Sequence, residues 1–133
     1  MEKSIKREVP RGSETILVVE DEADVRILTA RILRELGYTV LEASNGEEVL
    51  SIYEEWKTPI DLVLTDVVMP KMSAGELTKR LKSKNPGVKI LYMSGYTENT
   101  IVHKGILERE KDYIPKPFGK SDLARKVREV LDK

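Results

Sequence analysis

Five short apolar runs alternate with longer stretches in which apolar residues recur every three or four positions. The runs are Thr15–Val19, Tyr38–Leu41, Ile60–Thr65, Val88–Met93 and Tyr113–Ile114. The first, third and fourth are nearly continuous Val, Ile and Leu, which is typical of strands covered on both faces, as in a parallel sheet. Because helical stretches separate the strands and crossovers are right-handed, the pattern predicts an α/β fold: a (βα)5 chain forming a doubly wound, five-stranded parallel sheet.

Apolar residues at helical spacing predict five helices. In the first, Gly37 supplies the C-terminal stop. Its apolar positions are Val25, Leu28, Ile32, Leu33 and Leu36. A fourth helix is expected over about 98–107 and the last over about 121–132.

The second and third helices begin with polar pairs at capping-box spacing. Ser44 and Glu47 predict the start of the second helix, and Ser73 and Glu76 predict the start of the third. In such a pair the first side chain accepts from a backbone N–H of the first turn, and the second reaches back.

The first 13 residues differ from the rest of the chain. They are polar, contain Pro10 and Gly12, and show no apolar period, so we expect a flexible lead-in over 1–13 and one domain over 14–133. No apolar run approaches the roughly 20 residues that span a bilayer, and the start lacks the apolar segment of a secretory signal. We therefore expect a cytoplasmic protein without membrane insertion.

Composition changes this picture mainly through charge. The 133 residues include no cysteine, which excludes disulfide scaffolds and cysteine zinc sites. The net charge of zero divides into −9 over residues 14–66, +7 over 67–133 and +2 over the lead-in. A pI near 6.6 argues against direct nucleic-acid binding, which requires a concentrated basic face. The acidic half of the domain is the part suited to a cation.

Polar residues stand where the predicted strands end. Glu20 and Asp21 follow the first strand, Asp66 ends the third, Ser94 the fourth, and Lys116 follows the fifth. Ligands of doubly wound sheets bind at the carboxyl ends of the strands, so these side chains are expected to converge. Three converging carboxylates carry −3, which a divalent cation and Lys116 would balance. Oxygen ligands point to Mg²⁺, with Mn²⁺ as an alternative.

An acidic metal site beside a lysine suits phosphoryl chemistry, because both cations offset charge on phosphoryl oxygens while a carboxylate attacks. Asp66 is the best-placed nucleophile, since it stands alone at the end of a buried strand. The G-x-x-x-x-G-K-[ST] phosphate cradle is absent. The phosphoryl group is therefore expected to come from a partner protein or a small molecule.

Four sequence pieces together resemble the receiver domain of two-component response regulators. They are ILVVEDEADVR (16–26), LVLTDVVMP (62–70), ILYMSGYT (90–97) and YIPKPF (113–118), in the family's order. The resemblance covers about 14–132 and implies a flavodoxin-like strand order of 2-1-3-4-5.

The resemblance also implies roles for the acidic residues. Asp66 matches the phospho-accepting aspartate, and Asp21 matches the direct metal ligand. Glu20 matches the outer metal partner, where the family more often has Asp. Val68 would give its backbone carbonyl to the metal.

The remaining matches concern the response to phosphorylation. Ser94 matches the hydroxyl that binds the phosphoryl group, Lys116 the ion-pairing lysine and Tyr113 the switch aromatic. The family also implies a cis bond between Lys116 and Pro117.

The function implied is phosphorelay signal transduction. A histidine kinase or phosphotransfer protein would phosphorylate Asp66 with Mg²⁺, the domain would dephosphorylate itself, and affinity for a downstream protein partner would change. The basic runs 79–84 and 125–128 are solvated faces or docking surfaces, and a homodimer is compatible with the family. The chain resembles both free-standing regulators and the C-terminal receiver of hybrid sensor histidine kinases.

Two other functions match part of this pattern. A degenerate receiver that only binds partners would be expected to lose Asp66, Asp21 or Lys116, and all three are present. A Mg²⁺-dependent phosphatase would want a second acid two residues after Asp66, where this chain has Val68.

Overall fold

The computed structural model describes residues 9–56, 58–67, 71–94 and 112–133. Their elements are β1 (Thr15–Val19), α2 (Ala23–Glu35), β2 (Thr39–Ala43), α3 (Gly46–Glu55), β3 (Leu62–Asp66), α4 (Ala74–Lys84), β4 (Lys89–Ser94), β5 (Tyr113–Pro115) and α6 (Lys120–Leu131). The strands form one sheet in the order β2-β1-β3-β4-β5, and every neighbouring pair is parallel. The predicted fold class and strand order are confirmed.

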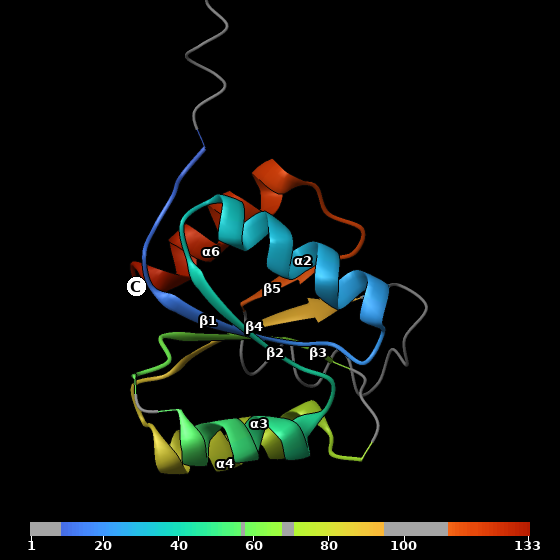
Figure 1. The fold of residues 1–133 in the computed structure, drawn as a ribbon, viewed down its shortest axis with the longest axis vertical. Helices are drawn as coiled ribbons and strands as arrows, with labels where there is room; N and C mark the ends of the chain where they lie inside the picture. Colours follow the sequence, from blue (N-terminus) through green and yellow to red (C-terminus); the bar gives the residue numbers. More distant parts are fainter. Residues whose placement is uncertain (1–8, 57, 68–70, 95–111) are drawn as a thin grey trace, which may run out of the picture.

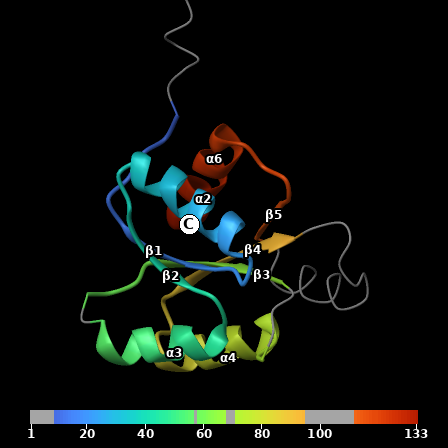
Figure 2. The ribbon, with the colours of Figure 1, turned by 45° about the vertical axis from the view of Figure 1, so that its right-hand side comes forward.

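The sheet separates two helical layers (Figure 1). Helices α2 and α6 cover one face, and α3 and α4 cover the other, an arrangement also visible after a 45° turn (Figure 2). Alternate residues of β1 supply the two cores: Ile16 and Val18 pack toward α2 and α6, and Leu17 and Val19 toward α3 and α4. Because both faces are covered, β1 and β3 are buried along their whole length, as their apolar sequences predict.

Helix α2 follows its predicted period with one exception. Leu33 and Leu36 are fully buried, but Leu28 is 54% exposed, and Ile27 beside it is 49% exposed. The helix turns Thr29 and Ala30 toward the sheet instead. Leu28 therefore fits the helical period but lies outside the buried stripe, and the first half of α2 presents an apolar pair to solvent.

Two predicted helix starts have different outcomes. Ser73 caps α4 as expected, accepting from the N–H of Glu76 at 3.1 Å. The cap of α3 lies one residue later than predicted, since Asn45 accepts from the N–H of Glu48 at 3.0 Å. Ser44 lies outside the helix, and its N–H donates to Oε1 of Glu48 at 2.7 Å. Both registers have capping spacing, and the one with Asn45 forms.

Residues 11 and 12, which precede β1, are hydrogen-bonded to the C-terminal end of α2. Gly37 has a φ of +107°, a left-handed conformation that favours glycine. Gly12 donates from its N–H to the carbonyl of Leu36 at 3.2 Å, and Arg11 donates to the carbonyl of Glu35 at 3.0 Å. Val9 packs against the core under α2 and α6. The boundary expected at residue 14 stays a prediction, but residues 9–12 contact the folded domain.

The predicted cis bond between Lys116 and Pro117 is present. The expected helix over 98–107 lies outside the described residues, so its prediction is not tested. None of the helices in the described ranges is long and apolar enough to cross a bilayer.

Candidate functional site

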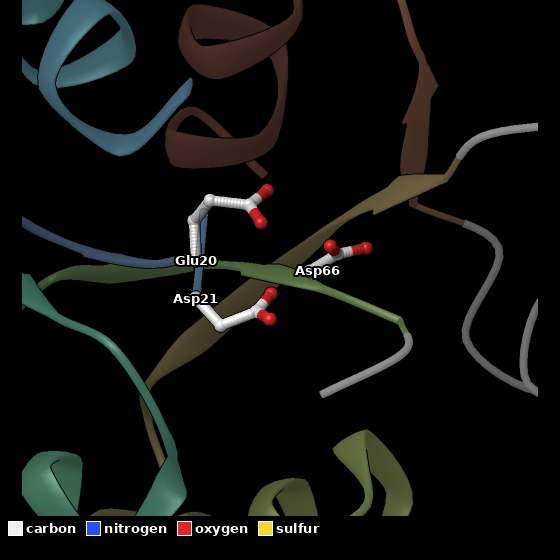
Figure 3. Close-up of side chains that lie close together, drawn as sticks. All are labelled: Glu20, Asp21 and Asp66. Atoms are coloured by element: carbon white, nitrogen blue, oxygen red, sulfur yellow. The ribbon is translucent and has the colours of Figure 1, made fainter. Parts of the chain in front are cut away.

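Three carboxylates meet at the carboxyl edge of the sheet (Figure 3). Glu20 and Asp21 follow β1, and Asp66 is the last residue of the neighbouring strand β3. One oxygen from each of the three lies within 4.8 Å of the others. Glu20 and Asp66 are buried, at 1% and 4% exposure, whereas Asp21 is exposed. The parallel pairing of β1 with β3 thus brings together the acids that the sequence placed at separate strand ends.

Lys116 reaches this cluster from the segment after β5. Its Nζ lies 3.2 Å from Oε1 of Glu20 and 3.2 Å from Oδ2 of Asp66. Its backbone N–H donates to the carbonyl of Ser94 at 2.8 Å, which ties the lysine to the end of β4. Ser94 is buried at the same edge, 4% exposed. Glu20, Asp21, Asp66 and Lys116 therefore converge as predicted, and Ser94 ends β4 beside them through its backbone contact with Lys116.

The electrostatics of the cluster reflect too many buried acids for one lysine. Burial and the neighbouring charge of Asp66 raise the pKa of Glu20 from 4.5 to about 7, although Lys116 opposes the rise. Burial acts to lower the pKa of Lys116, but the Asp66 and Glu20 carboxylates outweigh it and hold that pKa above its usual value. The lysine is therefore a fixed cation, and Glu20 is the group whose charge responds to pH near neutrality.

Backbone contacts hold the turn that carries the two acids. The N–H of Glu20 donates to the carbonyl of Ala43 on β2 at 3.0 Å. The N–H of Glu22 donates to Oε2 of Glu20 at 3.1 Å. Glu20 thus shares its two oxygens between the turn and Lys116, a division of roles that its sequence position did not indicate.

The donor set fits a hard divalent cation. It consists only of oxygens, two of the three carboxylates are buried, and Lys116 alone leaves the four side chains with a formal charge of −2. Like charges at this spacing cost several kcal/mol at intermediate dielectric, and a divalent cation would remove that cost. Mg²⁺ prefers carboxylate oxygens and retains waters, which an exposed Asp21 at the mouth of the cluster allows.

The predicted switch aromatic, Tyr113, does not belong to this cluster. Tyr113 lies on β5, is 40% exposed, and lines a surface pocket with Phe118 and Arg125. Val68 lies outside the described residues, so its carbonyl role stays a prediction.

Comparison with known proteins gives the site a family. The family model for the response regulator receiver domain matches residues 16–128. The sensor kinase CckA of Brucella abortus is 41% identical over 122 residues, which are 92% of this chain and 13% of that protein. The chemotaxis protein CheY of Thermotoga maritima is 33% identical over 116 residues, 86% of this chain and 95% of that protein.

A solved structure is similar throughout. The crystal structure of the receiver domain from the hybrid histidine kinase CckA matches with a TM-score of 0.71 and 36% identity, covering 88% of this chain and 98% of that one. Receiver domains generally bind Mg²⁺ at an acidic pocket and interact with histidine kinases or phosphotransfer proteins in two-component phosphorelays. The chain belongs to the response regulator receiver domain family and functions in phosphorelay signal transduction.

Proposed function

We propose that Asp66 is the residue of this chain that accepts the phosphoryl group, from a phosphohistidine of a partner protein. The observation that carries this proposal is the buried carboxylate of Asp66 at 3.2 Å from Nζ of Lys116, next to two further acids. A carboxylate in this position is a nucleophile, and positive charge from Lys116 and a bound divalent cation would favour its attack on the incoming phosphoryl group.

The transfer exchanges one bond to phosphorus for another. An oxygen of Asp66 forms a bond to phosphorus while the bond between phosphorus and the imidazole nitrogen breaks. The electron pair of the broken bond stays on the imidazole, which takes up a proton. Hydrolysis of the resulting acyl phosphate by water returns Asp66 and releases inorganic phosphate.

The acids around Asp66 would hold the metal. Asp21 and Asp66 are the proposed direct ligands of Mg²⁺, with Mn²⁺ as an alternative, and Glu20 is the outer partner. Bound Mg²⁺ would supply positive charge to the phosphoryl oxygens. Glu20 is suited to an outer role because its two oxygens already accept from Lys116 and from the N–H of Glu22.

The remaining site residues would read the phosphorylated state. Lys116 can bind phosphoryl oxygens in place of the Asp66 carboxylate, and Ser94, buried at the adjacent strand end, can offer its hydroxyl. Tyr113 is the proposed switch aromatic, since it is exposed on β5 three residues before the lysine. Its movement would change the surface of β5 and α6 that a downstream partner or a second copy of the chain contacts.

The partner that carries the phosphohistidine would dock on α2. This helix begins two residues after Asp21, at Ala23, and its exposed Ile27 and Leu28 offer apolar contact area one to two turns from the site. The partner is a histidine kinase or phosphotransfer protein. The match covers only 13% of the length of the sensor kinase CckA. The proposal therefore includes that this chain is the receiver part of a hybrid sensor histidine kinase.

The experiment is phosphorylation by a small acyl-phosphate donor with Mg²⁺, followed by intact mass spectrometry. Wild type should gain one phosphoryl group, and Asp66→Asn should gain none while keeping a native circular-dichroism spectrum. Asp24→Asn, which removes an exposed acid from the first turn of α2, is the matched control and should be phosphorylated like wild type. An undiminished adduct on Asp66→Asn would refute the assignment of Asp66.

A further inference from the structure

We infer that Arg26 is a positioning residue for the metal ligands, and that Glu42 acts on the same ligands by holding Arg26. The inference deepens the proposed function and rests on its metal site. It concerns α2 and β2, which contribute no carboxylate to the cluster itself.

Arg26 is bound to the backbone between the two acids. Its Nη1 donates to the carbonyl of Glu20 at 2.8 Å, and its side chain is 19% exposed. This carbonyl belongs to the peptide unit that joins Glu20 to Asp21, so its orientation sets the direction in which both side chains leave the chain. A hydrogen bond from a cation to a partly buried carbonyl is short and strong, which suits it to fix that peptide plane.

Arg26 is in turn held by the neighbouring strand. Its Nε lies 3.4 Å from Oε1 of Glu42, and Oε2 of the same carboxylate accepts from Nη1 of Arg34 at 3.1 Å. Arg34 also donates to the carbonyl of Val40 at 2.8 Å. Glu42 pairs in register with Val18 of β1, two residues before Glu20. The chain of contacts thus runs from β2 through α2 to the turn after β1.

A positioning role and a simple charge effect predict opposite results at Arg26. If Arg26 acted only through its charge, neutralising it would strengthen the binding of a cation nearby. If Arg26 orients the turn, neutralising it frees the peptide between Glu20 and Asp21 and weakens binding. Loss of a residue that orients metal ligands typically costs 10–100-fold in affinity. We expect the lower end, because Arg26 acts on the backbone rather than on a ligand side chain.

The test is calorimetric titration of the metal-free chain with Mg²⁺ alone, at pH 8 and constant ionic strength. Arg26→Gln should raise the Mg²⁺ dissociation constant about tenfold, Glu42→Gln severalfold, and Arg26→Lys by an intermediate factor. Arg31→Gln makes the same charge change on an exposed position of α2 and should stay within twofold. The double variant Arg26→Gln/Glu42→Gln should bind no more weakly than Arg26→Gln, because Glu42 acts through Arg26.

Unchanged or tighter binding by Arg26→Gln would overturn the inference, as would equal weakening by Arg31→Gln. A denaturant titration of each metal-free variant separates positioning from unfolding, and Arg26→Lys provides the comparison if Arg26→Gln does not fold. The readout contains no phosphoryl donor. Asp66 can therefore remain the acceptor when this inference fails, and a failure of Asp66 phosphorylation leaves the effect on Mg²⁺ binding intact.

Discussion

The sheet has an ionic cluster at each end of its parallel strands, here called the carboxyl edge and the amino edge. Each cluster is built around one cation from the C-terminal part of the chain. At the carboxyl edge Lys116 contacts Glu20 and Asp66. At the amino edge Arg128 of α6 contacts Glu14, before β1, with Nη2 at 2.6 Å from Oε2, and Asp132 at 2.9 Å. Both cations join distant parts of the sequence, and both are about a fifth exposed.

The acids distinguish the two clusters. The side chains of Glu20 and Asp66 are 2% and 6% exposed, whereas those of Glu14 and Asp132 are 30% and 62% exposed. Water can solvate the acids around Arg128, but those around Lys116 depend on the lysine and on whatever else binds there. Excess buried negative charge therefore marks the functional site, and the presence of an ion pair alone does not.

The same contrast sets opposite pH responses. The hydrogen bond from Arg128 lowers the pKa of Glu14 below 4.5, so the stability that this pair contributes is present above pH 4.5 and is lost on acidification. Burial raises the pKa of Glu20 to about 7, so its contribution is present below pH 4.5 and is lost as the pH rises through 7. One edge is stabilised by ionised acid, and the other is destabilised by it.

The largest expected effect tests the carboxyl edge. The rise in the pKa of Glu20 from 4.5 to about 7 corresponds to about 3 kcal/mol of unfolding free energy. At pH 8 the metal-free wild type should therefore be less stable than Glu20→Gln by up to that amount. Near pH 4 the two proteins should be equally stable. Urea unfolding at both pH values measures the difference. Mg²⁺ should reduce the difference at pH 8. A gap that does not depend on pH would show that Glu20 is already ionised at pH 4.

The second prediction tests how the amino edge is held. A Cβ at Gly37 would lie 2.4 Å from the carbonyl oxygen of Gly12 in a left-handed conformation. Gly37→Ala should therefore cost about 2 kcal/mol of unfolding free energy. Gly87→Ala, at a position with open space around the Cβ, should change it by less than about 0.5 kcal/mol. The Mg²⁺ affinity of Gly37→Ala should match wild type, and a large loss would show that the two edges are coupled.

The third prediction removes the cation of the amino edge. Arg128→Met should destabilise the chain by about 1–2 kcal/mol at pH 7, because charge-assisted hydrogen bonds contribute about 1.5–3 kcal/mol and this one is partly solvated. The loss should shrink on acidification below pH 4.5, as the pH falls through the lowered pKa of Glu14. Thermal unfolding across this pH range is the measurement. An equal loss at pH 3 and pH 7 would assign the effect to contacts of Arg128 that do not titrate in this range, namely its stem packing and its hydrogen bonds to the carbonyl of Arg11 and the hydroxyl of Tyr38.

The smallest expected stability effect belongs to the exposed face of α2. Leu28→Ser should change unfolding free energy by less than about 0.5 kcal/mol, because the side chain is half exposed. It should slow phosphorylation by a phosphohistidine protein severalfold and leave phosphorylation by a small acyl phosphate unchanged. Phosphorylation rates measured by stopped-flow kinetics with each of the two donors provide the comparison. Equal slowing with both donors would place the effect in the site and not in docking.

The sequence predicted the parts of the fold that follow from local patterns of apolar and polar residues. Continuous apolar runs located β1, β3 and β4 within two residues, and the polar residues at their ends identified the acids that converge. Local rules also left ambiguity, since Ser44 and Asn45 both stand three residues before a glutamate and only Asn45 forms the cap. Leu28 fits the helical period of α2 but lies at the margin of the buried stripe.

Unlike the contacts of Lys116, the long-range polar contacts of two arginines had no sequence signal. Arg26 and Arg128 look like ordinary surface arginines of amphipathic helices, and their partners Glu20 and Glu14 lie outside those helices. Glu42 lies on an edge strand where a charge needs no explanation. Such contacts depend on how the strands and helices pack in three dimensions, and local sequence patterns do not specify that packing.

The reach of Lys116 has a kinetic consequence. The contacts of this lysine span 96 residues to Glu20 and 50 residues to Asp66, so they close only after most of the chain has been ordered. Interactions completed late in folding are weak in the transition state, and strengthening them slows unfolding more than it speeds folding. A cation bound at this edge should therefore lower the unfolding rate and lengthen the lifetime of the native domain, with little change in its refolding rate.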